Sequence, residues 1–379
     1  MSNEPTPTLK LLLIEDSLTD AGLIQANLRI GLGTVDVHRV DRLSAAIAVL
    51  AVDSFSAILL DLNLPDSSGL DTFHRLAARS NGTPVIVLSG MDDSTTAIAA
   101  VSSGADDYVQ KNHYEAHTLA RSVRFAIERC NRRAVEDELS IVRNELTVAQ
   151  SVQDRLYPKT NPVIAGFDIA SGVRSAGIGC GDYYDFIALD DGRHIFVVGD
   201  VAGHGMGSAL VMAETRASLR TLTDIKIDTS LILPAMNRLI CSGTAEGMFV
   251  TLVLVIFDPA TQTFEYYNAG HPGWIVRKNT REQLTTHQIP LGLLADVDHS
   301  ASSTFQLAPG DILVVPTDGI HESPNKDEIF ETNRLLDCIE ANRNLNASEI
   351  VEGLFNAAIE FSDSEVLCDD MTLVVLKAK

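Results

Sequence analysis

Four aspartates between residues 182 and 369 of this 379-residue chain lie far apart in the sequence but in similar local settings. Each one stands beside a glycine or at the end of an apolar run of strand length, a setting that brings carboxylates together at the edge of a sheet. They are Asp182, Asp200, Asp318 and Asp369. Because hard divalent cations prefer oxygen ligands, the four acids predict a site for two cations that activate a bridging water for attack on a phosphate.

A different acidic set occupies the N-terminal third. Three carboxylates, one hydroxyl and one ammonium each follow a short apolar run: Glu15, Asp16, Asp61, Ser89 and Lys111. Mg²⁺ is typically held by one or two carboxylates together with water and phosphate oxygens, and a carboxylate can itself accept a phosphoryl group as a nucleophile. We expect Lys111 to pair with that phosphate as a point charge and Ser89 to hydrogen-bond to a phosphoryl oxygen.

The elements that position this set alternate between strands and helices. The predicted strands cover residues 11–14, 35–37, 57–60, 84–88 and 108–109, with helices over 19–28 and 45–50. Short, wholly apolar strands separated by helices are typical of buried parallel strands in a doubly wound, flavodoxin-like α/β sheet. Functional groups in such a sheet lie at the carboxyl ends of the strands, which is where these five residues occur.

The middle of the chain, residues 119–156, contains no Gly or Pro and predicts one long helix that ends at Tyr157 and Pro158. Two apolar seams follow each other along it with a one-residue slip in phase, and Gln153 is a polar interruption of the second. The first seam is Val123, Ile127, Cys130 and Ala134, and the second is Val135, Leu139, Val142, Leu146, Ala149 and Leu156. We expect this helix to pair with a second copy as a coiled coil. The alternative is a single amphipathic helix that lies on one of the domains.

From Gly166 onward the pattern is rich in strands. Predicted strands cover residues 194–198, 248–257, 264–268, 274–277, 311–315 and 371–377, with a helix over 207–222. The run from 248 to 277 predicts an antiparallel meander with a turn at Asp258 and Pro259. The expected architecture is α+β, with two antiparallel sheets and helices outside them.

Composition narrows the functional class. The net charge of −22 argues against nucleic acid as a main partner, because phosphate binding needs a basic face. Five dispersed Cys without a CxxC pair indicate reduced thiols. The N-terminus lacks the pattern of a signal peptide, and no apolar run approaches the roughly 20 residues of a spanning helix. These features predict a cytoplasmic protein with no nucleic-acid or membrane partner.

Residues from 10 to about 125 resemble a response-regulator receiver domain in the order and spacing of their motifs. The motifs are Glu15-Asp16, residues 61–65, Ser89 and residues 108–111. The resemblance implies that Asp61 accepts a phosphoryl group from a histidine kinase or a small phosphodonor. It implies that Glu15, Asp16, Asp61 and the Asn63 carbonyl hold Mg²⁺, and that Ser89 and Tyr108 are the pair that reorients on phosphorylation. The family usually has Pro after the lysine, and Asn112 departs from that pattern, so a cis peptide bond is not assumed there.

Residues from about 140 to 377 resemble the SpoIIE/RsbU type of the PPM metal-dependent serine/threonine phosphatases. The matching strings are residues 150–158, 181–186, 200–205, 209–213, 268–272, 290–293, 317–319 and 369–372. The resemblance implies two Mn²⁺ or Mg²⁺ ions bridged by Asp200 with help from the Val201 carbonyl. Asp318 and Asp369 would complete the shell of one ion, and Asp182 would serve the other.

Several residues near these motifs need separate interpretation. Cys180 replaces the usual Gly, and we expect a small packed side chain there in preference to a metal ligand. For His204 and His271 a structural role is favoured over general-acid catalysis. Asp185 and Asp370 stand one position from motif acids and are expected to support those acids or to be solvated.

The resulting division is a receiver domain over 8–125, a helical coiled-coil linker over 126–157 and a phosphatase domain over 158–379. The predicted function is a two-component response regulator whose output is a metal-dependent protein serine/threonine phosphatase, controlled through Asp61. By resemblance, its substrate is a phosphorylated anti-sigma-factor antagonist. The alternative is a receiver-controlled pseudophosphatase that binds a partner protein without turnover, which loss of metal-binding acids would favour.

Overall fold

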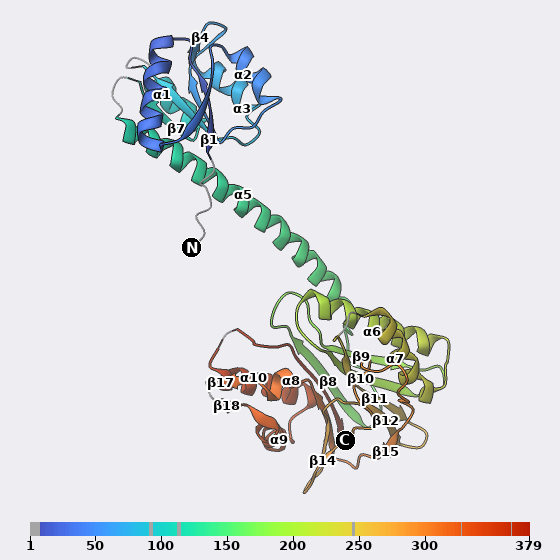
Figure 1. Ribbon diagram of the computed structural model, residues 1–379. Coiled ribbons are helices and arrows are strands. Elements are labelled where there is room, and N and C mark those ends of the chain that lie inside the picture. Colours follow the sequence, from blue (N-terminus) through green and yellow to red (C-terminus); the bar gives the residue numbers. More distant parts are fainter. Residues whose placement is uncertain (1–7, 91–93, 112–114, 245–246, 327, 365) are drawn as a thin grey trace. The chain divides into compact units, whose positions relative to one another are not determined.

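The computed structural model describes residues 8–90, 94–111, 115–244, 247–326, 328–364 and 366–379. The chain forms two compact units, Met1–Arg143 and Asn144–Lys379 (Figure 1). Helix α5 contributes its first part to one unit and its last residues to the other. Within the described ranges, none of the helices is both long and apolar enough to cross a bilayer.

The first unit is built on a parallel sheet with the strand order β2-β1-β3-β6-β7, which confirms the doubly wound α/β prediction. Its strands are β1 Leu9–Ile14, β2 Val35–Val40, β3 Ala57–Asp61, β6 Val85–Ser89 and β7 Asp107–Gln110. Its helices are α1 Leu18–Leu32, α2 Leu43–Leu50, α3 Leu70–Ala77, α4 Ser94–Ser102 and the start of α5 Ala116–Gln153. Two short strands, β4 Asn63–Leu64 and β5 Ser67–Ser68, form a small hairpin after β3.

Both faces of this sheet are buried, which explains why its strands are wholly apolar. Side chains alternate across a strand, so Leu11 and Leu13 pack with α1 and α5. Leu12 and Ile14 pack on the other face with α2, α3 and α4. Each face therefore acquires its own apolar core, and the polar residues that follow the strands remain at the carboxyl edge.

Helix α5 packs on the parallel sheet over its first turns only. Val123 is fully buried in the receiver core and Ile127 packs against that core, so the prediction that these residues begin a coiled-coil seam is wrong. The helix lies close to α1, because a Cβ on Gly31 would stand 2.6 Å from the Cβ of Ala120. From Val135 to Val142 the apolar side chains are exposed, as Val135 (64%) shows. Leu156 instead packs against a core of the second unit, so its assignment to the coiled-coil seam is wrong. The phase slip in the sequence thus marks the point where the helix leaves the receiver core.

The second unit is a sandwich of two antiparallel sheets, as predicted, with the orders β15-β12-β11-β10-β9 and β14-β13-β16-β19-β8. The first sheet comprises β9 Tyr183–Ala188, β10 His194–Val201, β11 Val250–Asp258, β12 Thr263–Ala269 and β15 Ser303–Phe305. The second comprises β8 Phe167–Arg174, β13 Trp274–Val276, β14 Arg281–Gln283, β16 Ile312–Pro316 and β19 Met371–Ala378. A small hairpin joins β17 Pro324–Asn325 to β18 Glu328–Ile329.

Helices cover the outer face of each sheet. Side chains of α6 Met206–Asp224 and α7 Ile232–Gly243, which are joined by the 3₁₀ turn η2 Thr229–Leu231, pack on β10 and β11. Side chains of α9 Glu331–Ala341 and α10 Ala347–Ser362 pack on β16 and β19. The short helix α8 Asp318–His321 follows β16 directly. A third apolar core fills the space between the two sheets.

The predicted three-strand meander is wrong in its last strand. Strands β11 and β12 pair as expected, but β13 pairs with β14 and β16 in the other sheet. Gly270 has a positive φ of 76°, which L side chains rarely adopt, and the chain turns there before it enters β13. The apolar pattern of β13 fits a buried strand in either sheet, so the sequence alone does not assign it.

Candidate functional site

The acids of the first unit converge at the carboxyl edge of the parallel sheet. Asp61 ends β3, Glu15 follows β1 and Lys111 follows β7, and these strands lie in one sheet. The Lys111 Nζ is 2.5 Å from Asp61 Oδ2 and 2.6 Å from Glu15 Oε2. One carboxylate oxygen each from Glu15, Asp16 and Asp61 lie within 4.8 Å of one another, although Asp16 is exposed.

The charges in this site are only partly balanced. Burial raises the pKa of Glu15 and the Asp61 charge adds to that effect, while Lys111 opposes it. Burial would lower the pKa of Lys111, but its hydrogen bonds to Asp61 and Glu15 raise it overall. Asp20 Oδ2 also lies 3.7 Å from the Lys111 Nζ, so one ammonium is outnumbered by carboxylates. The group of Glu15, Asp16 and Asp61 therefore fits a divalent cation of the size of Mg²⁺.

Ser89, Asn63 and Tyr108 lie close to this edge in the sheet. The strand register pairs Asp61 with Leu88, so Ser89 is one residue away; its buried hydroxyl has no hydrogen-bond partner among the described residues. The Asn63 backbone N–H donates to Asp61 Oδ1 at 3.1 Å. Tyr108 on β7 is 37% exposed. Asn112 lies outside the described residues.

Sequence reasoning missed Arg39 on β2. Its guanidinium donates to the main-chain oxygens of Glu15 (3.0 Å) and Asp16 (2.8 Å). It therefore fixes the backbone that carries both acids. A contact to main-chain oxygens leaves no pattern in a single sequence, so no motif could have revealed it.

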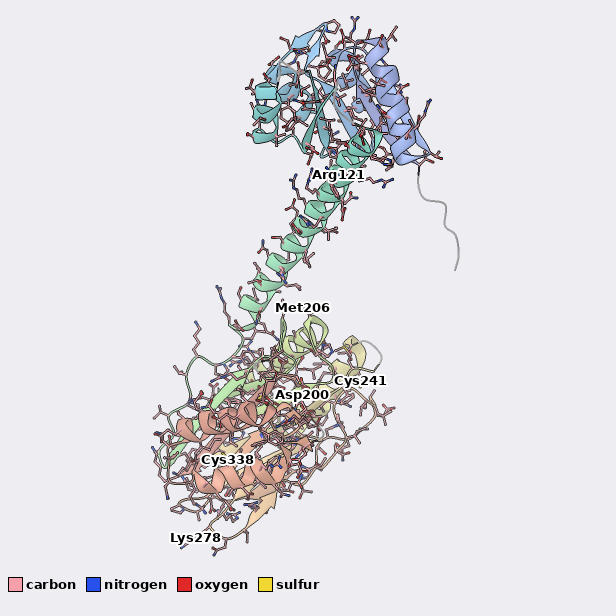
Figure 2. The ribbon with its side chains drawn as sticks, turned by 90° about the vertical axis from the view of Figure 1, so that its left-hand side faces the viewer. Arg121, Asp200, Met206, Cys241, Lys278 and Cys338 are labelled. Atoms are coloured by element: carbon pink, nitrogen blue, oxygen red, sulfur yellow. The ribbon has the colours of Figure 1, made fainter. Side chains whose placement is uncertain are left out.

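The four aspartates of the second unit, Asp182, Asp200, Asp318 and Asp369, lie at matching ends of the two sheets. Gly199 pairs with Tyr183 in the β9–β10 hairpin, so Asp182 and Asp200 occupy the same end of it. Pro316 pairs with Leu373, which brings the starts of α8 and β19 together at Asp318 and Asp369. Figure 2 shows Asp200 inside the second unit, with Met206 at the start of α6.

These acids form a concentrated negative charge. Burial raises the pKa of Asp200 to about 7, and the charges of Asp318 and Asp369 add to that effect. Burial, with the charge of Asp369, raises the pKa of Asp318 to about 6. Burial and the Asp200 charge raise the pKa of Asp182 well above its usual range. Such mutual repulsion is what bound cations relieve, so the residues fit a divalent metal site.

Neighbouring polar groups hold the Asp182 segment. The Thr317 hydroxyl donates to Asp182 Oδ2 at 2.7 Å. Asp370 accepts from the backbone N–H groups of Ala176 at 2.8 Å and Gly181 at 2.9 Å. A Cβ on Gly181 would stand 3.1 Å from the Val201 oxygen, so any side chain there would require its neighbours to shift. Asp370 is therefore a supporting residue and is not solvated.

Asp185 supports the fold and does not face the other acids. It is fully buried, and its two carboxylate oxygens accept hydrogen bonds from the guanidinium of Arg220, both at 2.7 Å. Tyr183 donates to the same carboxylate at 3.2 Å. These contacts join β9 to α6, so Asp185 is not solvated either.

The structure places the two histidines and Cys180 in different surroundings. His271 is 2% exposed, its Nδ1 lies 2.8 Å from the Thr251 hydroxyl, and burial lowers its pKa to about 3. His204 is exposed on the loop before α6. Cys180 is buried, and burial raises the pKa of its thiol, which disfavours the thiolate that a metal ligand requires.

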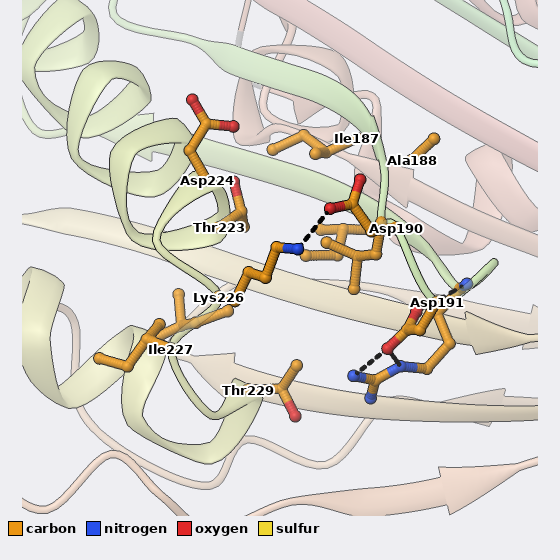
Figure 3. A pocket seen from close by; sticks show the side chains of 13 residues that line it. Ile187, Ala188, Asp190, Asp191, Thr223, Asp224, Lys226, Ile227 and Thr229 are labelled. Carbon is orange, nitrogen blue, oxygen red and sulfur yellow. Dashed lines mark hydrogen bonds and ion pairs between the residues drawn. The ribbon is translucent and has the colours of Figure 1, made fainter.

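Two cavities of the second unit differ in their relation to the acids. One, of about 270 Å³, has Asp200, Asp318 and His271 in its lining. The other, of about 400 Å³, lies at the opposite end of the β9–β10 hairpin (Figure 3). Its charged side chains form ion pairs such as that between Lys226 and Asp190 at 2.7 Å. The first cavity is thus placed to admit a substrate to Asp200 and Asp318, and a further cavity of about 220 Å³ has Asp369 in its lining.

Comparison with known proteins identifies the families that the two parts of the chain match. Residues 190–379 match the family model of Stage II sporulation protein E (SpoIIE). The chain belongs to the SpoIIE family. Residues 11–123 match the model of the response regulator receiver domain. The chain therefore joins a receiver domain to a metal-dependent protein serine/threonine phosphatase domain of the PPM type.

Individual relatives agree with both assignments. Phosphoserine phosphatase RsbU of Bacillus subtilis is 28% identical over 241 residues, which cover 63% of this chain and 71% of RsbU. The cell cycle transcriptional regulator CtrA of Caulobacter vibrioides is 33% identical over 113 residues, 30% of this chain and 48% of CtrA. The SiaA-PP2C domain of Pseudomonas aeruginosa, a solved structure, shares the fold with a TM-score of 0.57 at 19% identity, covering 64% of this chain and 99% of that domain.

Proposed function

We propose that this SpoIIE-family chain is a response regulator whose phosphatase output is controlled by phosphorylation of Asp61. The observation that carries the proposal is the presence of two acid sites in one chain. In the first site the buried Asp61 carboxylate forms an ion pair with Lys111. In the second site four aspartates lie close enough to repel one another electrostatically. The division into 8–125, 126–157 and 158–379 is part of the same proposal.

In the receiver, Asp61 is the proposed nucleophile toward a histidine kinase or a small phosphodonor. Mg²⁺, when bound by Glu15, Asp16, Asp61 and the Asn63 carbonyl, would supply charge neutralisation for the incoming phosphoryl group. Lys111 already contacts Asp61 Oδ2 and would turn to the phosphate as the carboxylate is consumed. The unpartnered Ser89 hydroxyl would donate to a phosphoryl oxygen, and Tyr108 would repack beside it.

In the phosphatase, we assign the two-cation site to the four acids and one carbonyl. Mn²⁺ or Mg²⁺ ions bound there would supply Lewis-acid chemistry and an activated bridging water. Asp200, with the Val201 carbonyl beside it, would be shared by both ions. Asp182 would hold one ion, and Asp318 and Asp369 would hold the other. Thr317 orients Asp182 through its hydroxyl. The cavity beside Asp200 and Asp318 would admit the phosphorylated side chain.

The proposed substrate is a phosphoserine or phosphothreonine of a partner protein. RsbU, a relative, is named a phosphoserine phosphatase. Family resemblance further points to an anti-sigma-factor antagonist as the partner. The pseudophosphatase alternative is not favoured, because all four motif acids are present and raise one another's pKa.

Coupling between the halves is proposed to run through α5 and a second copy of the chain. The apolar residues Val135, Leu139 and Val142 are exposed on this helix at 64%, 54% and 45%. Covering this stripe with the same stripe of another copy would bury it. Phosphorylation would then shift the pairing or docking of the helix, the two-state element that such control requires.

Hydrolysis assays on the full chain test the proposal. An aryl phosphate is supplied with and without Mn²⁺, and with and without an acyl phosphate that modifies receiver carboxylates. We expect hydrolysis to require the metal and its rate to change on donor treatment. Full activity in excess chelator, or no hydrolysis under any condition, contradicts the proposal.

A further inference from the structure

The last residue of α5, Gln153, contacts the main chain just before the phosphatase acid Asp182. Gln153 is 7% exposed, although it is the polar interruption of an otherwise apolar seam. Its side-chain Nε2 donates to the Cys180 carbonyl at 2.5 Å, and its Oε1 accepts from the Cys180 N–H at 2.9 Å. The amide therefore satisfies both main-chain polar groups of one residue, as a neighbouring strand would.

A second residue beyond the helix holds the same segment. The Tyr157 hydroxyl donates to the main-chain oxygen of Asp182 at 2.7 Å. The Tyr157 ring stacks on Tyr184, with ring centroids 5.4 Å apart, so its hydroxyl has little freedom. Burial raises the pKa of Tyr157 far above its usual range, so it remains a donor.

Three consecutive residues are thus held from three directions. Cys180 is held by Gln153, Gly181 by the Asp370 carboxylate and Asp182 by Tyr157. On the inner side, the segment packs against the loop that follows Asp200, because a Cβ on Gly179 would stand 2.9 Å from the Gly205 carbonyl carbon. A shift of this main chain would therefore move the Asp182 carboxylate relative to Asp200.

We infer that Gln153 and Tyr157 are positioning residues for the metal site and act through the backbone of Cys180–Asp182. This inference rests on the proposed function and deepens it, since it names the contacts by which α5 reaches the catalytic acids. A change in the last turn of α5 alters the hydrogen bonds to Cys180. The affinity of the site for its metal ions then changes without any change in the ligands themselves.

The variant Gln153→Leu tests this directly, because leucine preserves most of the side-chain volume and removes both hydrogen bonds. We expect the dissociation constant for Mn²⁺, measured by isothermal titration calorimetry on the full chain, to rise about 10-fold or more, as for other groups that orient metal ligands. Gln150→Leu, one turn earlier on the same helix, is the matched control and should bind Mn²⁺ like the wild type. Phosphorylation of the receiver, followed by intact mass, should be unchanged in both.

Tyr157→Phe is the milder second variant, since it removes one hydroxyl and keeps the ring stacked on Tyr184. We expect a smaller rise in the Mn²⁺ dissociation constant, and it provides the test if Gln153→Leu fails to fold. A merely structural role would lower the unfolding temperature but leave the affinity of the folded molecules unchanged. Wild-type Mn²⁺ affinity in the folded variants overturns this inference alone. Absence of Mn²⁺ binding in the wild type overturns the proposed function as well.

Discussion

Several carboxylates lie close together in each of the two acid sites of this chain, but the two sites differ in how that negative charge is balanced. In the receiver, the Lys111 ammonium lies between Asp61 and Glu15 and offsets part of their charge. In the phosphatase, burial and neighbouring carboxylates raise the pKa of Asp200 and of Asp318. The receiver site therefore tolerates the absence of a cation better than the phosphatase site does. We therefore propose that the first site is modified transiently and that the second binds metal throughout.

The largest expected effect of a single substitution is in the phosphatase site. Asp200→Asn removes the proposed bridging ligand and should lower the rate of aryl phosphate hydrolysis at least about 100-fold, the upper end of the losses seen when groups that only orient ligands are removed. The fold should persist, since the change also relieves repulsion among the acids. The control is Asp190→Asn at the distant cavity, where the side chain is exposed. Wild-type rates in the Asp200 variant would show that the ligand assignment is wrong.

Metal binding should stabilise the two units unequally. At a Mn²⁺ concentration 100-fold above its dissociation constant, the second unit should gain about 2.7 kcal/mol in its free energy of unfolding. The receiver should gain less, because Lys111 already neutralises part of its charge. Hydrogen exchange of the β10–β11 and β1–β3 amides, with Mn²⁺ and with chelator, measures both gains. Equal protection of the two sheets would remove the proposed distinction between the sites.

The receiver site should be modified at one carboxylate. Treatment with an acyl phosphate and Mg²⁺ should add the mass of a single phosphoryl group, and Asp61→Asn should lose that adduct. Asp16→Asn is expected to slow the reaction, since that side chain is placed to hold the cation. An adduct that persists in the Asp61 variant would move the acceptor to another residue.

The smallest expected effect is on association of the chain. Leu139→Lys combined with Leu146→Lys places charges on the proposed dimer seam and should shift the population toward the monomer in light scattering. The stripe at Leu139 is 54% exposed, so the folding of each unit should be unaffected. A variant that stays as dimeric and as donor-responsive as the wild type rules out coupling through helix pairing, while both site assignments stand.

Structure could be predicted best from the sequence where the local apolar pattern is compatible with only one tertiary environment. The parallel sheet could be predicted because its strands are buried on both faces, and the acids could be located because they follow those strands. The assignment of β13 to the second sheet could not, because its apolar residues suit either one. Val123 was assigned to the wrong partner for the same reason, since a buried helix face looks alike against a sheet or a second helix.

The hydrogen bonds that support the two sites could not be assigned from sequence patterns. Arg39 and Gln153 both act on main-chain groups of residues distant in sequence, and the partner residue type is irrelevant to such bonds. Gln153 did leave one trace, a polar residue inside an apolar seam. A buried polar side chain needs partners, so that interruption was the available signal of a specific contact.

The central claim is that phosphorylation of Asp61 changes metal-dependent hydrolysis at the other acid site. The most direct measurement is the rate of aryl phosphate hydrolysis with saturating Mn²⁺, before and after acyl phosphate treatment, in the wild type and in Asp61→Asn. Mg²⁺ is present throughout, and intact mass reports the extent of modification in each sample. We predict that the wild-type rate changes in proportion to the phosphorylated fraction and that the rate of Asp61→Asn does not respond to the donor. A wild-type rate that stays constant at full phosphorylation would contradict the account.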